Sequence, residues 1–189
     1  MQDEKYNETL HHLLRERMAS GDRAHLRVTT RSMCPVIAPG DVIAIHGCAP
    51  EELRRGDILL YENKQAFCTH RLLYKYLKGG ELFLVTKGDG TAITDIPFTK
   101  KQLLGKVAAI KKGERTTNLE KIPWRIINWL LGTFSLMERR VFVIGRRIKR
   151  KILGERRTPF TPVIKRLLKI PLLLFSIAAT KFLRFSGAL

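Results

Sequence analysis

Cysteine is scarce in this sequence of 189 residues, which contains only Cys34, Cys48 and Cys68. Their number is odd and they lie far apart, so they form neither a disulfide framework nor a paired zinc-ligand spacing. The pattern favours a reducing compartment.

Long apolar runs are also missing. The longest uncharged stretches are Ile126–Met137, with 12 residues, and Ile170–Thr180, with 11, whereas a membrane-spanning helix needs about 20. Residues 1–18 contain acidic side chains and no apolar segment, so they predict neither a signal peptide nor a membrane anchor. We therefore expect nothing at the front of the chain to carry the following residues across a membrane.

Acidic residues are few in the second part of the chain. Residues 1–110 carry 16 basic and 13 acidic side chains, whereas residues 111–189 carry 19 basic and only 4 acidic ones. The formal net charge of +18 therefore arises mainly from the second part. This asymmetry predicts an anionic partner, either a membrane surface or a nucleic acid.

Residues 1–24 predict one amphipathic helix. Its apolar side chains recur at helical spacing between residues 3 and 19, and Gly21-Asp22 ends the pattern. The apolar positions are Tyr6, Leu10, Leu13, Leu14 and Met18. We expect this stripe to pack against the core of the following domain.

Residues 25–112 predict a compact, mainly β domain with mostly antiparallel strands. Short apolar segments alternate there with Gly-Asp turn signals, a spacing typical of β domains. With 44% apolar and 28% charged residues the composition is that of a globular protein. The segments expected to form strands are residues 25–30, 41–47, 57–63, 67–77, 82–88 and 103–112.

Residues 113–189 predict a basic, amphipathic helical tail. Helices lying in a membrane interface, with Trp124 and Trp129 near the headgroups, would explain both its apolar content and its charge. We therefore expect residues 122–189 to bind an anionic membrane surface, and consider a nucleic acid the less favoured partner because of the apolar residues. A helical appendage packed on the β domain or on a protein partner remains an alternative. The tail prolines divide it into at least two helical pieces; they are Pro159, Pro162 and Pro171.

Three residue types needed for serine hydrolysis occur in suggestive positions. A serine hydroxyl is a weak nucleophile, so it needs a base that takes its proton and a third group that orients that base. Ser32 lies where a predicted strand gives way to a proline-containing turn, His70 follows in a strand segment, and Asp89 and Asp95 come later. Each residue alone also fits a structural role, since turns commonly contain serine and Gly-Asp pairs.

Five ordered segments resemble the conserved boxes of type I signal peptidases. They are SMCPVIAPGD, RRGDILLY, THRLL, TKGDGTAITD and LLGKVAAI, which together extend over about residues 26–111. The likeness is strongest to the endoplasmic-reticulum and archaeal branch, which uses histidine where most bacterial enzymes use lysine. The resemblance implies a β peptidase domain shared with the repressor autoproteases, and peptide-bond hydrolysis without metal or cofactor.

The resemblance also implies roles for individual residues. Ser32 matches the nucleophile and His70 the general base, while Asp95 matches the triad acid by its spacing and Asp89 a second important carboxylate. Thr30 matches a hydroxyl that, with the backbone N–H of Ser32, stabilises the oxyanion. For Thr30, a simple β-branched strand residue is the alternative.

The sequence departs from the signal peptidase pattern in two places. Arg31 stands where the family usually has glycine, and an N-terminal membrane anchor is not predicted. We therefore expect a Ser-His-Asp peptidase, either cytoplasmic or bound peripherally to the inner face of a membrane by its basic tail, that cleaves an extended segment of a protein or precursor peptide. The alternative is a catalytically silent peptide-binding or scaffold module of a membrane-associated complex. A regulator like the repressor autoproteases is less favoured, since about 24 residues before the first strand leave room for only one helix.

Overall fold

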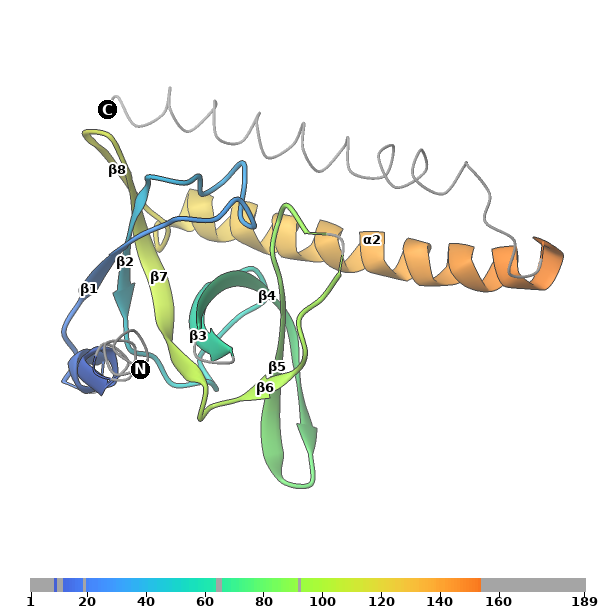
Figure 1. The fold of residues 1–189 in the computed structure, drawn as a ribbon, viewed down its shortest axis with the longest axis horizontal. Coiled ribbons are helices and arrows are strands. Elements are labelled where there is room, and N and C mark those ends of the chain that lie inside the picture. The colour runs from blue at the N-terminus through green and yellow to red at the C-terminus, as the bar shows by residue number, and fades with distance from the viewer. Residues whose placement is uncertain (1–8, 10–11, 19, 64–65, 92, 154–189) are drawn as a thin grey trace.

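The computed structural model describes residues 9, 12–18, 20–63, 66–91 and 93–153. Its strands form a strongly curved sheet, and one long helix runs along one side of it (Figure 1). The three tail prolines, and with them the predicted division of the tail into helical pieces, lie outside the described residues.

All strand pairs are antiparallel and belong to one eight-stranded sheet. The order is β1-β2-β7-β3-β4-β5-β6, and β8 pairs with β7. The strands are β1 (Ala24–Arg27), β2 (Val42–His46), β3 (Ile58–Asn63), β4 (Ala66–Lys78), β5 (Glu81–Lys87), β6 (Phe98–Thr99), β7 (Leu103–Lys112) and β8 (Arg115–Asn118), and the long helix is α2 (Ile122–Leu153).

The prediction of a mainly β protein is confirmed, since β1 to β5 and β7 overlap the six segments expected to form strands. The sequence analysis missed β6 and β8. Both strands are short, and the residues of β8 are also polar. The helical tail was expected to begin at residue 113, and this boundary is wrong. Gly113, with a positive φ of 57°, turns the chain back so that β8 pairs with β7, and the helix begins only at Ile122.

The N-terminal helix packs on the sheet as expected. Residues 12–18 are helical, with Leu14 and Met18 buried in the main core and Leu13 exposed. Residues 1–8, 10, 11 and 19 of the predicted helix lie outside the described residues. Gly21 follows with a φ of 78°, which ends the helix where the Gly-Asp signal predicted.

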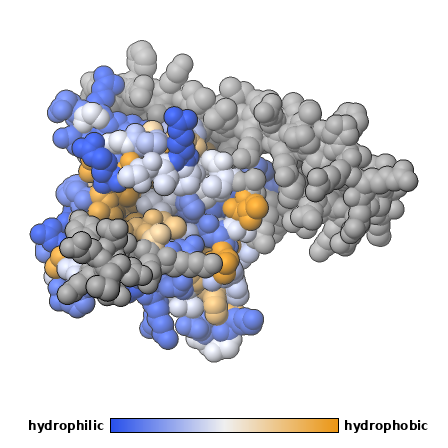
Figure 2. Space-filling model, in the orientation of Figure 1, coloured by the Kyte–Doolittle hydropathy of each residue, from blue (hydrophilic) through white to orange (hydrophobic). Residues whose placement is uncertain are grey.

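Strand β3 contributes to two hydrophobic clusters because successive strand residues point to opposite faces of a sheet. Ile58 and Leu60 join the main core, which also holds Ile45. Leu59 and Tyr61 join a second cluster on the other face. On the coloured part of the surface in Figure 2, hydrophilic residues surround separate apolar patches.

The first turns of α2 belong to the globular domain. Trp124 and Leu131 are buried in the main core, and Asn128 is buried beside them. The expectation that Trp124 lies near lipid headgroups is therefore wrong, because its indole ring packs inside the protein, whereas Trp129 is 48% exposed. No helix in the described ranges is both long and apolar enough to span a bilayer.

Candidate active site

Ser32 lies in a turn that the core holds firmly. β1 ends at Arg27, earlier than the expected Thr30, and the chain then enters turns from Ser32 onward. The next residues place Met33 and Ile37 in the main core, with 1% and 0% exposure. The backbone N–H of Ile37 donates to the carbonyl of Met33 at 3.0 Å. Ser32 is thereby fixed at the surface by its buried neighbours.

The Ser32 hydroxyl lies beside that of Thr30. Their Oγ and Oγ1 atoms are 3.2 Å apart, and either can be the donor. Both groups are accessible, because Ser32 is half-buried and Thr30 exposed. The two residues that the resemblance implies for the oxyanion hole thus present their hydroxyls together.

His70, on β4, is bonded to Asp95. Its Nδ1 atom lies 2.7 Å from Asp95 Oδ2, and their side chains are 12% and 17% exposed. The Thr86 hydroxyl donates to the same carboxylate oxygen at 2.7 Å, and the Thr86 carbonyl accepts from the Asp95 backbone N–H at 2.9 Å. The Tyr61 hydroxyl lies 3.3 Å from His70 Nδ1. The imidazole and the carboxylate are therefore held in one orientation.

The Asp95 carboxylate is ionised at neutral pH. Burial raises the pKa of Asp95, but hydrogen bonds from His70 and Thr86 and the charge of His70 together hold it below its ordinary value. An ionised carboxylate only accepts hydrogen bonds, so His70 Nδ1–H is the donor, and whenever the imidazole is neutral the lone pair is on Nε2. Burial also raises the pKa of the Tyr61 hydroxyl, which stays protonated.

Gly88 lies close to both His70 and the Ser32 turn. A Cβ atom on Gly88 would lie 2.6 Å from the Ser32 carbonyl oxygen and 3.1 Å from His70 Nε2. The backbone N–H of Gly90 donates to the Ser32 carbonyl at 2.8 Å. Glycine is thus required at position 88 by close approach, and the loop places His70 Nε2 alongside the Ser32 turn.

No hydrogen bond joins Ser32 Oγ to His70 Nε2 among the residues that the structure describes. Catalytic hydrogen bonds are often long without substrate and tighten when it binds.

Asp89 occupies a different environment from Asp95. Its two carboxylate oxygens accept from Arg71 Nε and Nη2 at 2.8 and 2.7 Å, and the two side chains are 0% and 6% exposed for Arg71 and Asp89. Arg71 Nη1 also donates to the Gly56 carbonyl at 2.9 Å and to Asn128 Oδ1 at 2.8 Å. The structure therefore brings His70 together with Asp95 and not with Asp89.

Helix α2 makes a second polar contact with the sheet, at the last residue of β5. Lys87 Nζ donates to Glu138 Oε2 at 2.8 Å, and their side chains are 2% and 15% exposed. Asn128 and Glu138 were not identified from the sequence, because nothing local marks a helix residue as a partner of a distant loop. Arg71 stood in the THRLL segment, but only as the neighbour of His70.

Arg31 fits the turn because its side chain is exposed. Its carbonyl accepts from the Cys34 backbone N–H at 3.1 Å, and a Cβ on Gly90 would lie 3.0 Å from that carbonyl oxygen. The turn therefore makes its contacts through the Arg31 backbone, and a side chain in place of the expected glycine is accommodated.

The cysteines are unpaired in the structure. Burial raises the pKa of the Cys48 thiol to about 11 and also raises that of Cys68. Within the described ranges, no group of three or more His, Cys, Asp or Glu side chains could hold a metal ion.

Comparison with protein-family models and with curated proteins finds no match for this chain. The geometry around Ser32, His70 and Asp95 therefore has to carry the functional interpretation. The likeness of the five sequence segments to signal peptidases adds an expectation about fold and substrate.

Proposed function

We propose that the protein is a serine endopeptidase with a signal-peptidase-like β domain, in which Ser32 is the nucleophile and His70 the general base. The main support is the 2.7 Å contact between His70 Nδ1 and Asp95 Oδ2, which leaves His70 Nε2 free beside the Ser32 turn. A second support is the fixed position of that turn, which would hold the nucleophile in place.

In the proposed reaction, Ser32 Oγ attacks the carbonyl carbon of the scissile peptide bond and passes its proton to His70 Nε2. Asp95 stabilises the imidazolium that forms, and the Thr30 hydroxyl with the Ser32 backbone N–H stabilises the oxyanion. His70 then gives the proton to the leaving amine. Water, activated in turn by His70, hydrolyses the acyl-enzyme and releases the second product.

The proposed substrate is an extended segment of a protein or precursor peptide. Ile93 and Ile96 stand near Asp95 in sequence and are 78% and 76% exposed, so they offer apolar contacts to a peptide that passes the site. Small residues before the scissile bond follow from the resemblance to signal peptidases. We propose a cytoplasmic location on the basis of the free cysteines.

The test is labelling of the purified protein with a fluorescent acylating serine probe. Ser32→Ala should abolish labelling, and His70→Ala and Asp95→Asn should slow it by about 10³- to 10⁴-fold, since both remove base catalysis. Ser20→Ala, a change to another serine on the exposed surface, is the matched control and should label like the unmodified protein. The proposal fails if the unmodified protein labels no faster than Ser32→Ala while both show the same unfolding curve.

A peptide-binding module with a silent site is the second candidate. One observation favours it: the hydroxyl of Ser32 is hydrogen-bonded to Thr30 and not to His70. Such a module would bind extended peptides with unchanged affinity after Ser32→Ala and would hydrolyse none of them. Peptide binding measured by fluorescence anisotropy, together with the labelling experiment, separates the two functions.

A further inference from the structure

Helix α2 carries apolar side chains on two opposite faces. The face that includes Trp124 and Leu131 is buried against the sheet. On the other side, Ile122, Ile126 and Trp129 follow at helical spacing, and they are 72%, 55% and 48% exposed. An ordinary surface helix buries one apolar stripe and presents a polar stripe to solvent. The second, exposed apolar stripe of α2 therefore indicates a surface that binds a partner.

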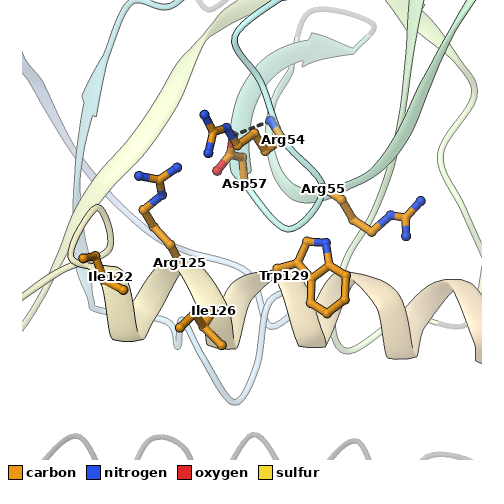
Figure 3. Close-up of a pocket in the computed structure, with 7 residues that line it drawn as sticks. All are labelled: Arg54, Arg55, Asp57, Ile122, Arg125, Ile126 and Trp129. Carbon is orange, nitrogen blue, oxygen red and sulfur yellow. Dashed lines mark hydrogen bonds between the residues drawn. The ribbon is translucent and has the colours of Figure 1, made fainter.

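Arginines surround this second stripe. Arg54 and Arg55 come from the turn before β3, and Arg125 lies on α2, where its side chain extends towards Arg54 and Asp57 (Figure 3). Together with the apolar stripe they line a hollow of about 310 Å³. The one acidic group there, Asp57, already accepts a hydrogen bond from the Arg54 backbone N–H at 2.7 Å. The hollow is therefore both apolar and positively charged.

We propose that this surface docks on an anionic phospholipid bilayer. We call it the docking face, and it consists of Ile122, Ile126, Trp129, Arg54, Arg55 and Arg125. Apolar side chains that enter the headgroup region, next to arginines that pair with lipid phosphates, are the two contributions that hold an interfacial helix on a membrane. Tryptophan is particularly suited to the headgroup level because its ring is amphipathic.

The charge of the remaining chain supports a lipid partner. Residues 139–153, which continue α2, contain seven basic and no acidic residues. Residues 154–189 contain seven basic residues and one acidic residue, so this part of the sequence also matches an anionic surface in charge. A nucleic acid would match the positive charge of the docking face. It would not bury Ile122, Ile126 and Trp129, however, since its affinity for proteins comes mainly from phosphate contacts.

The test uses the full chain with vesicles of phosphatidylcholine, alone or mixed with phosphatidylglycerol. The protein should float with the mixed vesicles and not with the neutral ones. We expect Trp129→Ser to weaken partitioning about tenfold, and Arg54→Gln and Arg125→Gln about fivefold each. The matched controls are Leu77→Ser and Lys78→Gln, which change exposed residues of the β4–β5 hairpin and should change partitioning less than about twofold.

Tryptophan quenching by brominated lipids tests the same surface without a substitution. Trp129 is exposed and Trp124 is buried, so quenching of the unmodified protein reports mainly on the docking face. It should disappear in Trp129→Phe. Vesicle binding that the docking-face variants leave unchanged, equal binding to neutral vesicles, or tighter binding to duplex DNA than to anionic vesicles would overturn the proposal.

This inference is independent of peptidase activity. Ser32→Ala should bind the mixed vesicles like the unmodified protein, and the docking-face variants should keep their reactivity towards the serine probe in the absence of lipid. Failure of one proposal therefore leaves the other standing.

Discussion

Two neighbouring residues of β4 hold two aspartates of the same loop region in different ways. His70 and Arg71 point to opposite sides of the strand. The His70–Asp95 pair is 12% and 17% exposed, whereas the Arg71–Asp89 pair is 0% and 6% exposed. The first pair keeps an unoccupied nitrogen, His70 Nε2, within reach of other groups, and the second has none to spare. The buried pair is therefore suited to holding the loop in place, and the more exposed pair is the one that we propose transfers a proton.

Every side-chain nitrogen and carboxylate oxygen of the buried pair has a hydrogen-bond partner. Arg71 donates through Nε, Nη1 and Nη2 to Asp89, Gly56 and Asn128. In the described part of the chain no buried side-chain nitrogen or oxygen lacks a hydrogen-bond partner. A buried ion pair contributes little net stability compared with an apolar replacement, but removing one partner is costly because the other charge stays buried. Single substitutions in the two pairs should therefore differ strongly in their effect on the free energy of unfolding.

Arg71→Met should destabilise the protein by about 3–5 kcal/mol, because it leaves the Asp89 charge buried without a partner. His70→Gln should cost much less, since Asp95 reaches solvent and keeps Thr86. Urea unfolding at neutral pH measures both. The double variant Arg71→Met/Asp89→Leu is the control and should recover much of the loss. Equal effects of Arg71→Met and His70→Gln would remove the contrast between the two pairs.

Asn128→Ala should cost about 3 kcal/mol, because Arg71 Nη1 then loses one of two buried acceptors. If the peptidase proposal holds, the substitution should also slow probe labelling, since Arg71 holds the loop next to Gly88. Asn128→Asp keeps an acceptor and should retain most of the stability. A loss no larger than about 0.5 kcal/mol, measured by urea unfolding, would show that α2 does not support the buried pair.

Asp95→Asn should cost about 2 kcal/mol at neutral pH, the usual contribution of a charge-assisted hydrogen bond. The pKa of Asp95 is lowered in the folded protein, so its contribution to stability is present above its ordinary value of 3.8 and is lost as pH falls through the lower folded value. The free-energy difference between the unmodified protein and Asp95→Asn should therefore shrink on acidification. Urea unfolding at a series of pH values measures it, and a difference independent of pH would contradict the assignment.

Arg15→Gln should have the smallest effect. Arg15 and Glu62 form a 2.8 Å ion pair whose side chains are 44% and 27% exposed, and exposed pairs contribute at most about 1 kcal/mol. We expect a loss below about 0.5 kcal/mol that disappears in 1 M salt. A loss comparable to that of Arg71→Met would mean that burial does not decide how much each ion pair contributes to stability.

Much of the sheet could be predicted from the sequence, because alternating apolar residues between Gly-Asp turns mark strands locally. β8 could not, since its residues are polar and its pairing depends on the turn at Gly113. The burial of Trp124 could not be predicted either. Tryptophan next to arginine fits an interfacial helix as well as a packed one, and only the position of α2 against the sheet distinguishes them.

Part of the candidate site could likewise be predicted from the sequence, and part could not. Ser32 and His70 could be identified from their segments, because the end of a strand and a turn are local features. The choice between Asp89 and Asp95 could be argued only from the resemblance, because local sequence does not say which carboxylate reaches which face of β4. Asn128 is 57 positions from Arg71, and no local pattern joins them.

The amino-acid sequence by itself determined the apolar strand segments, the Gly-Asp turns between them and where positive charge accumulates, because propensity, periodicity and composition are properties of neighbouring residues. Only the tertiary structure decided that His70 meets Asp95, that Arg71 meets Asp89 and Asn128, and that α2 leaves one apolar face uncovered. Those contacts depend on the path of the loop after β5 and on the packing of the helix, which bring together side chains that are distant along the chain.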